Sequence, residues 1–481
     1  MAGNFAASPT FSLQPSAQQV PLSTNYITNF DFLNQYLPDT YEKEFERYGN
    51  RTLSAFLKMV GAEMPSNSDL IKWAEQGRLH IKYENVTSGA AAGQNTATLT
   101  VNDSPIGANP VGTVITGENP YSAQGGIAVR IGQTVVISDN AGGGENKAVV
   151  TAVDLVNSTF DVAYYEAAGQ IAAQGAATTV FIYGSEFEKG TAGMQGSLQS
   201  DDYIFENNPI ILKDTYLVNG SDMAQIGWIE ISTEDGGSGY LWYLKSEHET
   251  RLRFDDYLET SMIEAVPAEA NSGAAGQGLI GSEGVFHAVS TRGNLWSGGT
   301  PDVLADFDAV IDRLDKQGAI EENVIFLNRQ FGFDIDDMLA AQNSYGAGGT
   351  SYGLFDNDEE MALNLGFTGF RRGYDFYKSD WKYLNDPTMR GGISGTGAIN
   401  GLLVPAGSTS VYDQVLGKNA KRPYLHVRYR ASETEDRRYK TWITGSAGGA
   451  ATTDIDEMRV NFLSERCVCV MGANNFVLFE D

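Results

Sequence analysis

The chain has 481 residues and carries 33 Lys and Arg against 61 Asp and Glu, so its formal net charge is −28. Apolar residues make up 42% and aromatic residues 11%, which is enough for a sizeable core and excludes disorder as a description of the whole chain. A surface this negative repels phosphate backbones and excludes a general nucleic-acid-binding protein. The two cysteines and four histidines are too few for a disulfide framework or a rich metal cluster.

Targeting segments are not visible either. The first basic residue is Lys43, so no charged segment leads an apolar one and no secretory signal is predicted. No stretch approaches the roughly 18 consecutive apolar residues of a membrane-spanning helix. We therefore expect a chain that is made in a cytoplasm and has no membrane partner.

Residues 1–38 are polar and loop-like, with three hydrophobic anchors, Phe5, Phe11 and Leu13. Such an arm buries too little to fold alone, so it is either disordered or lies against something else, such as a neighbouring subunit. Residues 39–84 are predicted to be a helical segment that leads to a first strand. It would hold one helix over 40–60 and a short one over 68–76.

Residues 85–183 differ sharply in composition, because only nine of these 99 residues are charged. Short runs such as TATLTVN, TVVIS and TFDVAYY alternate in polarity and are separated by Gly and Asn turns, as half-buried strands are. We predict an inserted small all-β domain here, a barrel or a sandwich. Residues 184–239 then read as extended strands joined by loops.

The clearest predicted helix spans 240–263. Its apolar stripe is Leu241, Leu244, His248, Leu252, Leu258 and Met262, and its polar side is Lys245, Glu249, Arg253, Asp256 and Glu259. A second helix is predicted from a cap at Thr300 to Gly318, followed by a strand over 323–327 and a helix over 335–342. The remaining strands are predicted at 400–405, 425–431, 438–444 and 458–465, and a hairpin turn at Ala473–Asn475. This succession indicates an α+β fold.

Motifs for chemistry are weak. Cys467 and Cys469 would face one side of a strand, but they lack the spacing and the partners of a zinc or redox site, so we interpret them as small core residues. No metal-binding pair of histidines, nucleophile elbow or phosphate-binding loop is present. We predict no catalytic residue, no cofactor and no metal, and hence a protein that is not an enzyme.

Basic residues are scarce but grouped. Arg371 and Arg372 form one pair, and Arg437 and Arg438 another, on an otherwise acidic chain. They would either recognise acidic patches on another copy of the chain or form ion pairs within it, which contribute little at an exposed surface. Both alternatives stay open at this point.

The stretches NNPIILKDTYLVNGSDMAQIGWIEI, YLWYLKSEHETRLRFDDYLE and FLSERCVCVMGANNFVLFE, in that order, resemble the major capsid proteins of tailed double-stranded-DNA phages, with the Hong Kong ninety-seven type fold and especially the crAss-like group. The resemblance implies an N-arm over 1–38, an E-loop within 184–239, and a peripheral domain with its spine helix over 240–344. It further implies an axial domain over about 345–420 and C-terminal strands over 421–481 that return to the body, with 85–183 as the inserted domain.

The function that this resemblance implies is structural. Pentamers and hexamers of the chain would form an icosahedral phage head, made in a bacterial cytoplasm, that encloses double-stranded DNA without binding it specifically. Portal, scaffold and decoration or auxiliary capsid proteins would be its partners. The alternatives are an extracellular carbohydrate-active enzyme with an accessory β domain and another virion component, such as a tail or fibre protein. Neither a cleaved scaffolding segment nor a Lys–Asn cross-link can be placed on the sequence.

Overall fold

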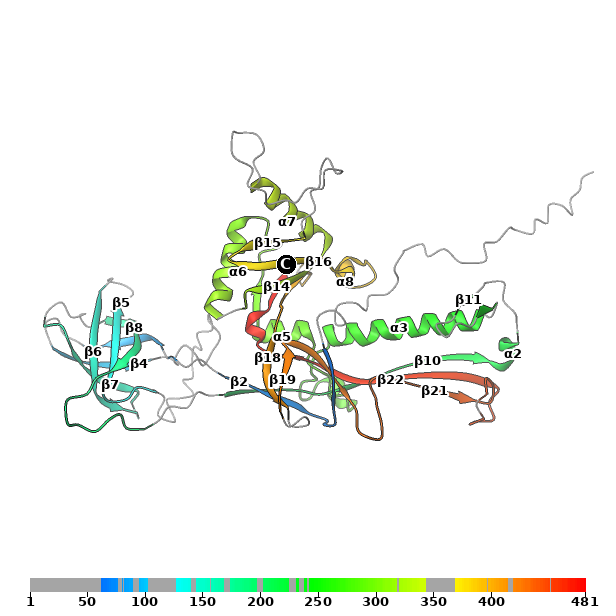
Figure 1. Cartoon of the computed structure of the whole chain (residues 1–481), viewed down its shortest axis with the longest axis horizontal. Coiled ribbons are helices and arrows are strands. Elements are labelled where there is room, and N and C mark those ends of the chain that lie inside the picture. The colour runs from blue at the N-terminus through cyan, green and yellow to red at the C-terminus, as the bar shows by residue number, and fades with distance from the viewer. Residues whose placement is uncertain are drawn as a thin grey trace, which may run out of the picture.

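The structure is a computed structural model of the chain (Figure 1). The residues that it describes are 62–76, 80, 82–89, 95–102, 127–139, 144–155, 157–167, 174–196, 202–224, 231–232, 238–239, 242–317, 320–342, 368–395, 397–413, 418–449 and 451–481. The anchors Phe5, Phe11 and Leu13 and the helix predicted over 40–60 lie outside these residues. The described part is a mixed α+β fold made mostly of strands, which confirms the predicted fold class at this level. No helix in it is long and apolar enough to cross a membrane.

The head, in the middle of Figure 1, is built on a six-stranded mixed sheet. Its order is β13 (Asn294–Trp296), β23 (Val477–Glu480), β17 (Ile399–Pro405), β14 (Glu322–Leu327), β16 (Tyr374–Asp380) and β15 (Gly369–Arg372). Helices α6 (Leu304–Gln317) and α7 (Arg329–Gln342) pack on one face, around the buried rings of Phe307, Phe331 and Phe479. Helices α5 (Val285–Arg292) and α8 (Lys382–Asn385) pack on the other face.

A second sheet lies below the head and extends into a long arm. Its order is β1 (Ala62–Ser66), β20 (Leu425–Arg430), β22 (Glu457–Val470) and β10 (Ile210–Asn219), and β21 (Lys440–Gly445) also pairs with β22. The 14-residue strand β22 belongs to both parts, because its first ten residues pair with β10, and in part with β21, and its last five pair with β20. The arm and the base of the head therefore share one continuous strand.

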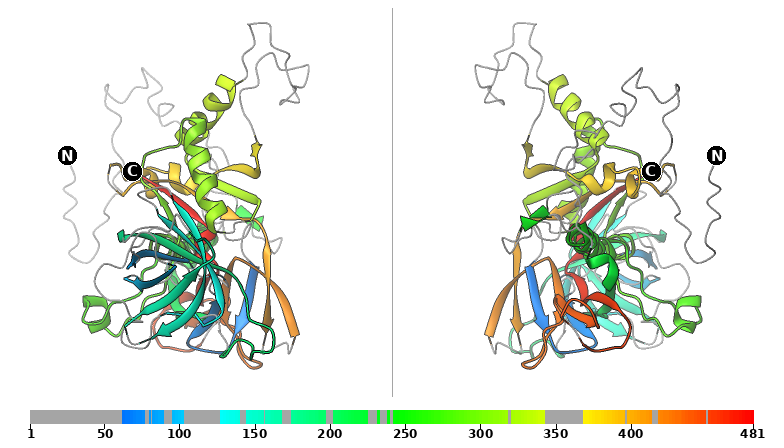
Figure 2. Two further views of the ribbon diagram at one scale, coloured as in Figure 1. Left: turned by 90° about the vertical axis from the view of Figure 1, so that its left-hand side faces the viewer. Right: turned by 90° about the vertical axis from the view of Figure 1, so that its right-hand side faces the viewer.

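Helix α3 (Trp242–Glu264) covers one face of the arm, and Figure 2 shows it end-on beside the strands. Phe254 and Leu258 of α3 pack on Val218, Val460 and Phe462 of the sheet. The helix predicted over 240–263 is confirmed, but its predicted polar side is wrong at Glu259, which is buried. His248, predicted on the apolar stripe, is exposed. The buried side is centred on Phe254, so the stripe is rotated from the predicted one.

Six strands between Lys82 and Ser185 close into a barrel, at the left of Figure 1. They run in the order β3 (Lys82–Ser88), β4 (Thr96–Val101), β7 (Thr159–Tyr164), β6 (Glu145–Asp154), β5 (Gln133–Asp139) and β8 (Gln174–Ser185). The alternating runs of the sequence lie in these strands, and their apolar positions fill the barrel. A two-stranded ribbon of β2 (Ile71–Gln76) and β9 (Asp202–Asn207) lies between the barrel and the head.

The remaining elements are short. They are α2 (Gly220–Met223), β11 (Ile231–Ser232), β12 (Ser238–Gly239), α4 (Gly273–Gly276), β18 (Ser408–Asp413), β19 (Lys418–Pro423) and the 3₁₀ turns Arg390–Gly392 and Ala473–Asn475.

Three local predictions are wrong. The helix predicted over 68–76 is largely strand β2, because its residues alternate in exposure and pair with β9. The turn at Ala473–Asn475 does not close a hairpin, since β22 and β23 belong to different sheets. Thr300 does not begin the second helix: α6 starts at Leu304, and the Thr300 hydroxyl donates to Asp334 instead.

Candidate assembly surface

The arm has one covered and one open face. In the ladder between β10 and β22, even-numbered residues face α3, so Ile211 and Leu217 lie on the opposite face. Trp442 of β21 is on this open face too, because it pairs with Asn461. The side chains of Ile211, Leu217 and Trp442 are 53%, 45% and 38% exposed. Ile211 and Leu217 lie six residues apart on β10, with Lys213 and Thr215 between them on the same face, so the three side chains are spread along the face and do not form one contiguous patch. We call these three residues the open-face cluster.

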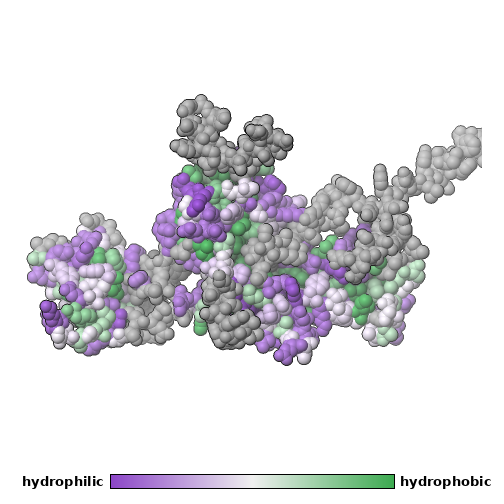
Figure 3. All heavy atoms as spheres, in the orientation of Figure 1, coloured by the Kyte–Doolittle hydropathy of each residue, from purple (hydrophilic) through white to green (hydrophobic). Residues whose placement is uncertain are grey.

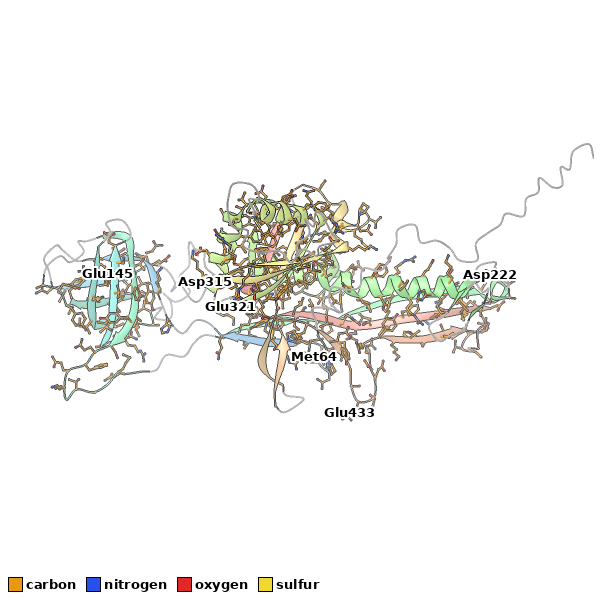
Figure 4. The ribbon with its side chains drawn as sticks, turned by 45° about the horizontal axis from the view of Figure 1, so that its top comes forward. Met64, Glu145, Asp222, Asp315, Glu321 and Glu433 are labelled. Carbon is orange, nitrogen blue, oxygen red and sulfur yellow. The ribbon has the colours of Figure 1, made fainter. Side chains whose placement is uncertain are left out.

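The open-face cluster leaves large apolar side chains in water on a face where the described residues place no second layer. Fully burying such a side chain stabilises a protein by about 1.5–3 kcal/mol, so half-exposed ones leave part of that free energy available to a partner. Figure 3 shows hydrophobic residues on the barrel, the head and the arm alike. Among the described residues, the arm extends away from the head on the side opposite the barrel, with Asp222 at its far end and Glu145 in the barrel (Figure 4).

The ribbon is fixed to the head by Arg292, at the end of α5. Its guanidinium lies 4.4 Å from the ring centre of Phe205 on β9 and 5.7 Å from that of Trp73 on β2. The same group donates to Glu283 over 2.7 Å and lies 3.9 Å from Glu75. A stacked and ion-paired arginine of this kind binds the ribbon to the head by charge and by packing.

Asn207 makes a second connection at the point where β9 leads into β10. Its amide nitrogen donates to the backbone oxygens of Glu283 and Val468, over 2.8 and 2.6 Å. Its amide oxygen accepts from Ser282 and from the backbone amides of Asn208 and Glu283. The side chain is buried and its hydrogen bonds are satisfied, so it fixes the direction in which the arm leaves the head.

The predicted arginines are engaged within the chain. Arg371 pairs with Asp375 over 3.1 Å, and Arg372 binds Asp308 of α6 through two hydrogen bonds. The bonded Arg372 holds the pKa of Asp308 below its usual range.

Arg437 pairs with Glu465 over 2.6 Å, and Arg438 pairs with Glu63 and lies over the ring of Tyr429. These contacts favour the intrachain interpretation of both arginine pairs. The structure does not bring the two pairs together: one lies on the edge strand β15 of the head, the other between β20 and β21. A role for them between subunits stays a prediction.

Cys467 and Cys469 are free and buried on β22. A hydrogen bond with Cys469 and burial raise the pKa of the Cys467 thiol, so this side chain is an inert core residue. Among the described residues, no group of three or more His, Cys, Asp or Glu side chains is arranged to hold a metal ion.

The open-face cluster was not predicted, although the sequence contains a signal for it. Strand β10 reads IILKDTYLVN, with the adjacent apolar pairs Ile211-Leu212 and Leu217-Val218. Because successive residues of a strand point to opposite faces, such pairs place an apolar side chain on each face. The pattern therefore indicates a strand that needs cover on both sides, and α3 supplies only one.

No protein-family model matches the chain, and no curated protein matches it either. Solved structures do overlay on it. A chain from Microbacterium phage Oxtober96 is 9% identical, with a TM-score of 0.41, over 94% of this chain and 99% of that one. A chain from the capsid of a native GTA particle is 8% identical, with a TM-score of 0.36, over 95% and 98%. One from the mature capsid of bacteriophage PhiM1 is 9% identical, with a TM-score of 0.33, over 62% and 78%.

These overlays concern the fold alone. Chains from a phage capsid and from the capsid of a GTA particle are among the solved structures that overlay on it. The crAss-like subgroup stays a prediction.

Proposed function

We propose that the chain is the structural subunit of a phage capsid and that copies of it assemble through the arm. The observation that carries the proposal is the open-face cluster: an arm one helix and one sheet thick whose outer face exposes Ile211, Leu217 and Trp442. Exposed apolar clusters on soluble proteins mark surfaces that bind other proteins. A second copy is the partner that is always present at the right ratio in a homomeric assembly.

The geometry suits a shell. The barrel, the head and the arm are spread along the longest dimension of the molecule instead of packing into a single globule (Figure 1). A chain of this form offers different surfaces at its two ends, so that contacts of one copy with the next are heterologous, and such contacts form rings when the rotation between copies closes. The junction at Arg292 and Asn207 holds the arm in one direction, as repeated contacts in a ring require.

The finer assignments follow the sequence resemblance. In them, the chain forms pentamers and hexamers of an icosahedral head that encloses double-stranded DNA, α3 is the spine helix, and the extended segment 184–239 supplies the E-loop. The barrel is an inserted domain, and the chain resides in the virion with portal, scaffold and decoration proteins. The net charge of −28 supports a wall that repels the DNA it encloses.

The test is assembly of the purified chain, with any scaffold protein of the same phage co-expressed. Electron microscopy and light scattering should show closed shells. The variant Leu217→Lys/Trp442→Lys should stay as dispersed, folded subunits, because each lysine would have to lose its hydration when the open face is covered. Leu155→Lys, at an exposed turn of the barrel, is the matched control and should still assemble.

Two results would overturn the proposal. The first is that the unaltered chain, with its scaffold, stays monomeric. The second is that the arm variant assembles as well as the control. Rod-shaped trimeric particles would instead favour a tail or fibre component.

A further inference from the structure

The outer surface of the barrel carries three exposed aromatic side chains that the proposed shell does not use. Phe181 and Tyr183 lie on β8, and Tyr165 follows the end of β7. Their side chains are 41%, 50% and 49% exposed. We call these three residues the aromatic patch.

The strand register shows that the patch lies outside the barrel. Val180 and Ile182 of β8 belong to the barrel core, so Phe181 between them points outward. Phe181 pairs with Val136 of β5, which is nearly buried although it is on the outer side. Side chains above Val136 must therefore cover it. The outer surface here is a packed platform and not a row of isolated side chains.

Strand β8 has a β-bulge at Tyr183, within the aromatic patch. The register between β5 and β8 shifts where Thr134 pairs with Gly184 and Val135 with Ile182, so Tyr183 is the extra residue. Bulges bend a strand and redirect a side chain, and they are frequent next to binding sites. The exposed fractions of Phe181 and Tyr183 show that both face outward across this bulge.

Tyr165 is held in place at the other side of the patch. Its backbone amide donates to the Lys147 carbonyl over 3.0 Å, and its hydroxyl donates to Glu186 Oε2 over 2.5 Å. Desolvation and the Glu186 carboxylate, with a smaller contribution from Tyr183, raise the pKa of Tyr165 to about 12. Tyr165, Tyr183 and Glu186 thus lie together, and the phenol ring is fixed before any ligand arrives.

Charge limits what the patch can bind. Residues 82–185 contain three Lys and Arg and eight Asp and Glu, which gives 3 − 8 = −5. Aromatic platforms also stack nucleic-acid bases, but those sites lie in positively charged grooves. The barrel therefore disfavours nucleic acids and acidic polymers and favours an uncharged ligand.

Size gives a second limit. Fully buried aromatic side chains bury about 150–250 Å² each, so three half-exposed ones have about 300 Å² left to bury. A stable protein–protein interface buries about 800 Å² on each partner. The patch is too small for a folded protein and suits a thin ligand with flat apolar faces.

We propose that the aromatic patch binds a neutral polysaccharide. The C–H faces of its pyranose rings would stack on Phe181 and Tyr183, and its hydroxyl groups would bond to polar side chains at the edge of the patch. Glu186 and the Lys82–Glu84 pair, with atoms 2.7 Å apart, supply carboxylate acceptors and an ammonium donor there. Phe181 lies next to Lys82 in the β3–β8 register, so a sugar on its ring reaches that pair. This polysaccharide binding does not depend on shell assembly.

Affinity electrophoresis of the full-length chain tests the proposal, in gels that contain hydroxyethylcellulose, mannan or dextran. We expect at least one of these neutral polysaccharides to retard the unaltered chain. Phe181→Ala/Tyr183→Ala should weaken the retardation at least tenfold in apparent Kd. Leu155→Ala, which removes an equally exposed apolar side chain elsewhere on the barrel, should leave it unchanged. Far-ultraviolet circular dichroism checks that all three chains are folded.

Three results would overturn the proposal. One is that none of the three polysaccharides retards the unaltered chain. Another is that the double variant is retarded as strongly as the Leu155 control. The last is that the double variant loses shell assembly while its retardation stays normal, which would make the patch a protein contact.

Discussion

Replacing Arg292 should release the ribbon from the head while leaving the rest of the chain folded. Arg292→Ala removes the hydrogen bond to Glu283 and leaves that carboxylate nearly buried without its partner. Breaking a fully buried ion pair costs about 3–5 kcal/mol, and because both side chains here are about 15% exposed the lower value applies. Loss of the stacking on Phe205 adds about 1 kcal/mol. The ribbon should therefore be destabilised by about 3–4 kcal/mol.

Hydrogen exchange followed by mass spectrometry measures this effect locally. A loss of 3–4 kcal/mol corresponds to amide exchange that is about 100- to 1,000-fold faster in β2 and β9, since each 1.4 kcal/mol is a factor of ten. Arg292→Lys keeps the charge but loses the planar stack. Its amide exchange in β2 and β9 should therefore be faster than in the unaltered chain and slower than in Arg292→Ala. Arg459→Ala is the control, because Arg459 is exposed and, in the described part of the chain, forms an ion pair only with Glu457 two residues away, over 3.0 Å.

The reasoning is refuted if exchange in β2 and β9 is unchanged in Arg292→Ala. It is also refuted if the control accelerates exchange there equally, or if Arg292→Lys is as protected as the unaltered chain. A uniform acceleration over all strands would mean that Arg292 supports the whole fold and not the ribbon.

Two further predictions concern the buried hydrogen bonds of Asn207 and Tyr383. Asn207→Leu should lower the free energy of unfolding by about 2–4 kcal/mol in a denaturant titration, because buried backbone groups such as the Glu283 amide lose their partner; an unchanged midpoint would contradict this. Burial and the hydrogen bond to Glu264 raise the pKa of Tyr383 above its usual value of about 10. Its contribution to stability is therefore complete below pH 10 and lost as the pH rises further, so Tyr383→Phe should give a flatter stability curve above pH 10, and an equally steep one would refute the assignment.

Local patterns predicted the parts of the fold that depend on local sequence. The helix over 240–263 is long and amphipathic, so its position was found within two residues, at Trp242–Glu264. The segment over 68–76 was predicted wrongly because its strand form depends on β9, more than 120 residues later in the chain. Short apolar runs take the conformation that a distant partner stabilises, and the sequence of the run does not name that partner.

The same limit applies to the candidate site. Arg438 reads as a free cation beside the acids of SETEDRR, yet its partner Glu63 lies 375 residues away in the chain. Nothing in the spacing of either residue reveals the pair. Two members of the open-face cluster, Ile211 and Leu217, in contrast lie on β10, and the adjacent apolar pairs of that strand would have revealed them. What remained hidden was which face α3 covers, because that depends on how the chain turns back after β10.

The continuous strand β22 has a mechanical consequence. A pull on the arm along its length travels through the covalent chain of β22 directly into the sheet below the head. It loads the ten residue pairs between β10 and β22 in shear, all at once, and cannot peel them apart one by one. The arm therefore resists tension far better than bending. A particle built from such subunits would hold internal pressure better along its arms than across them.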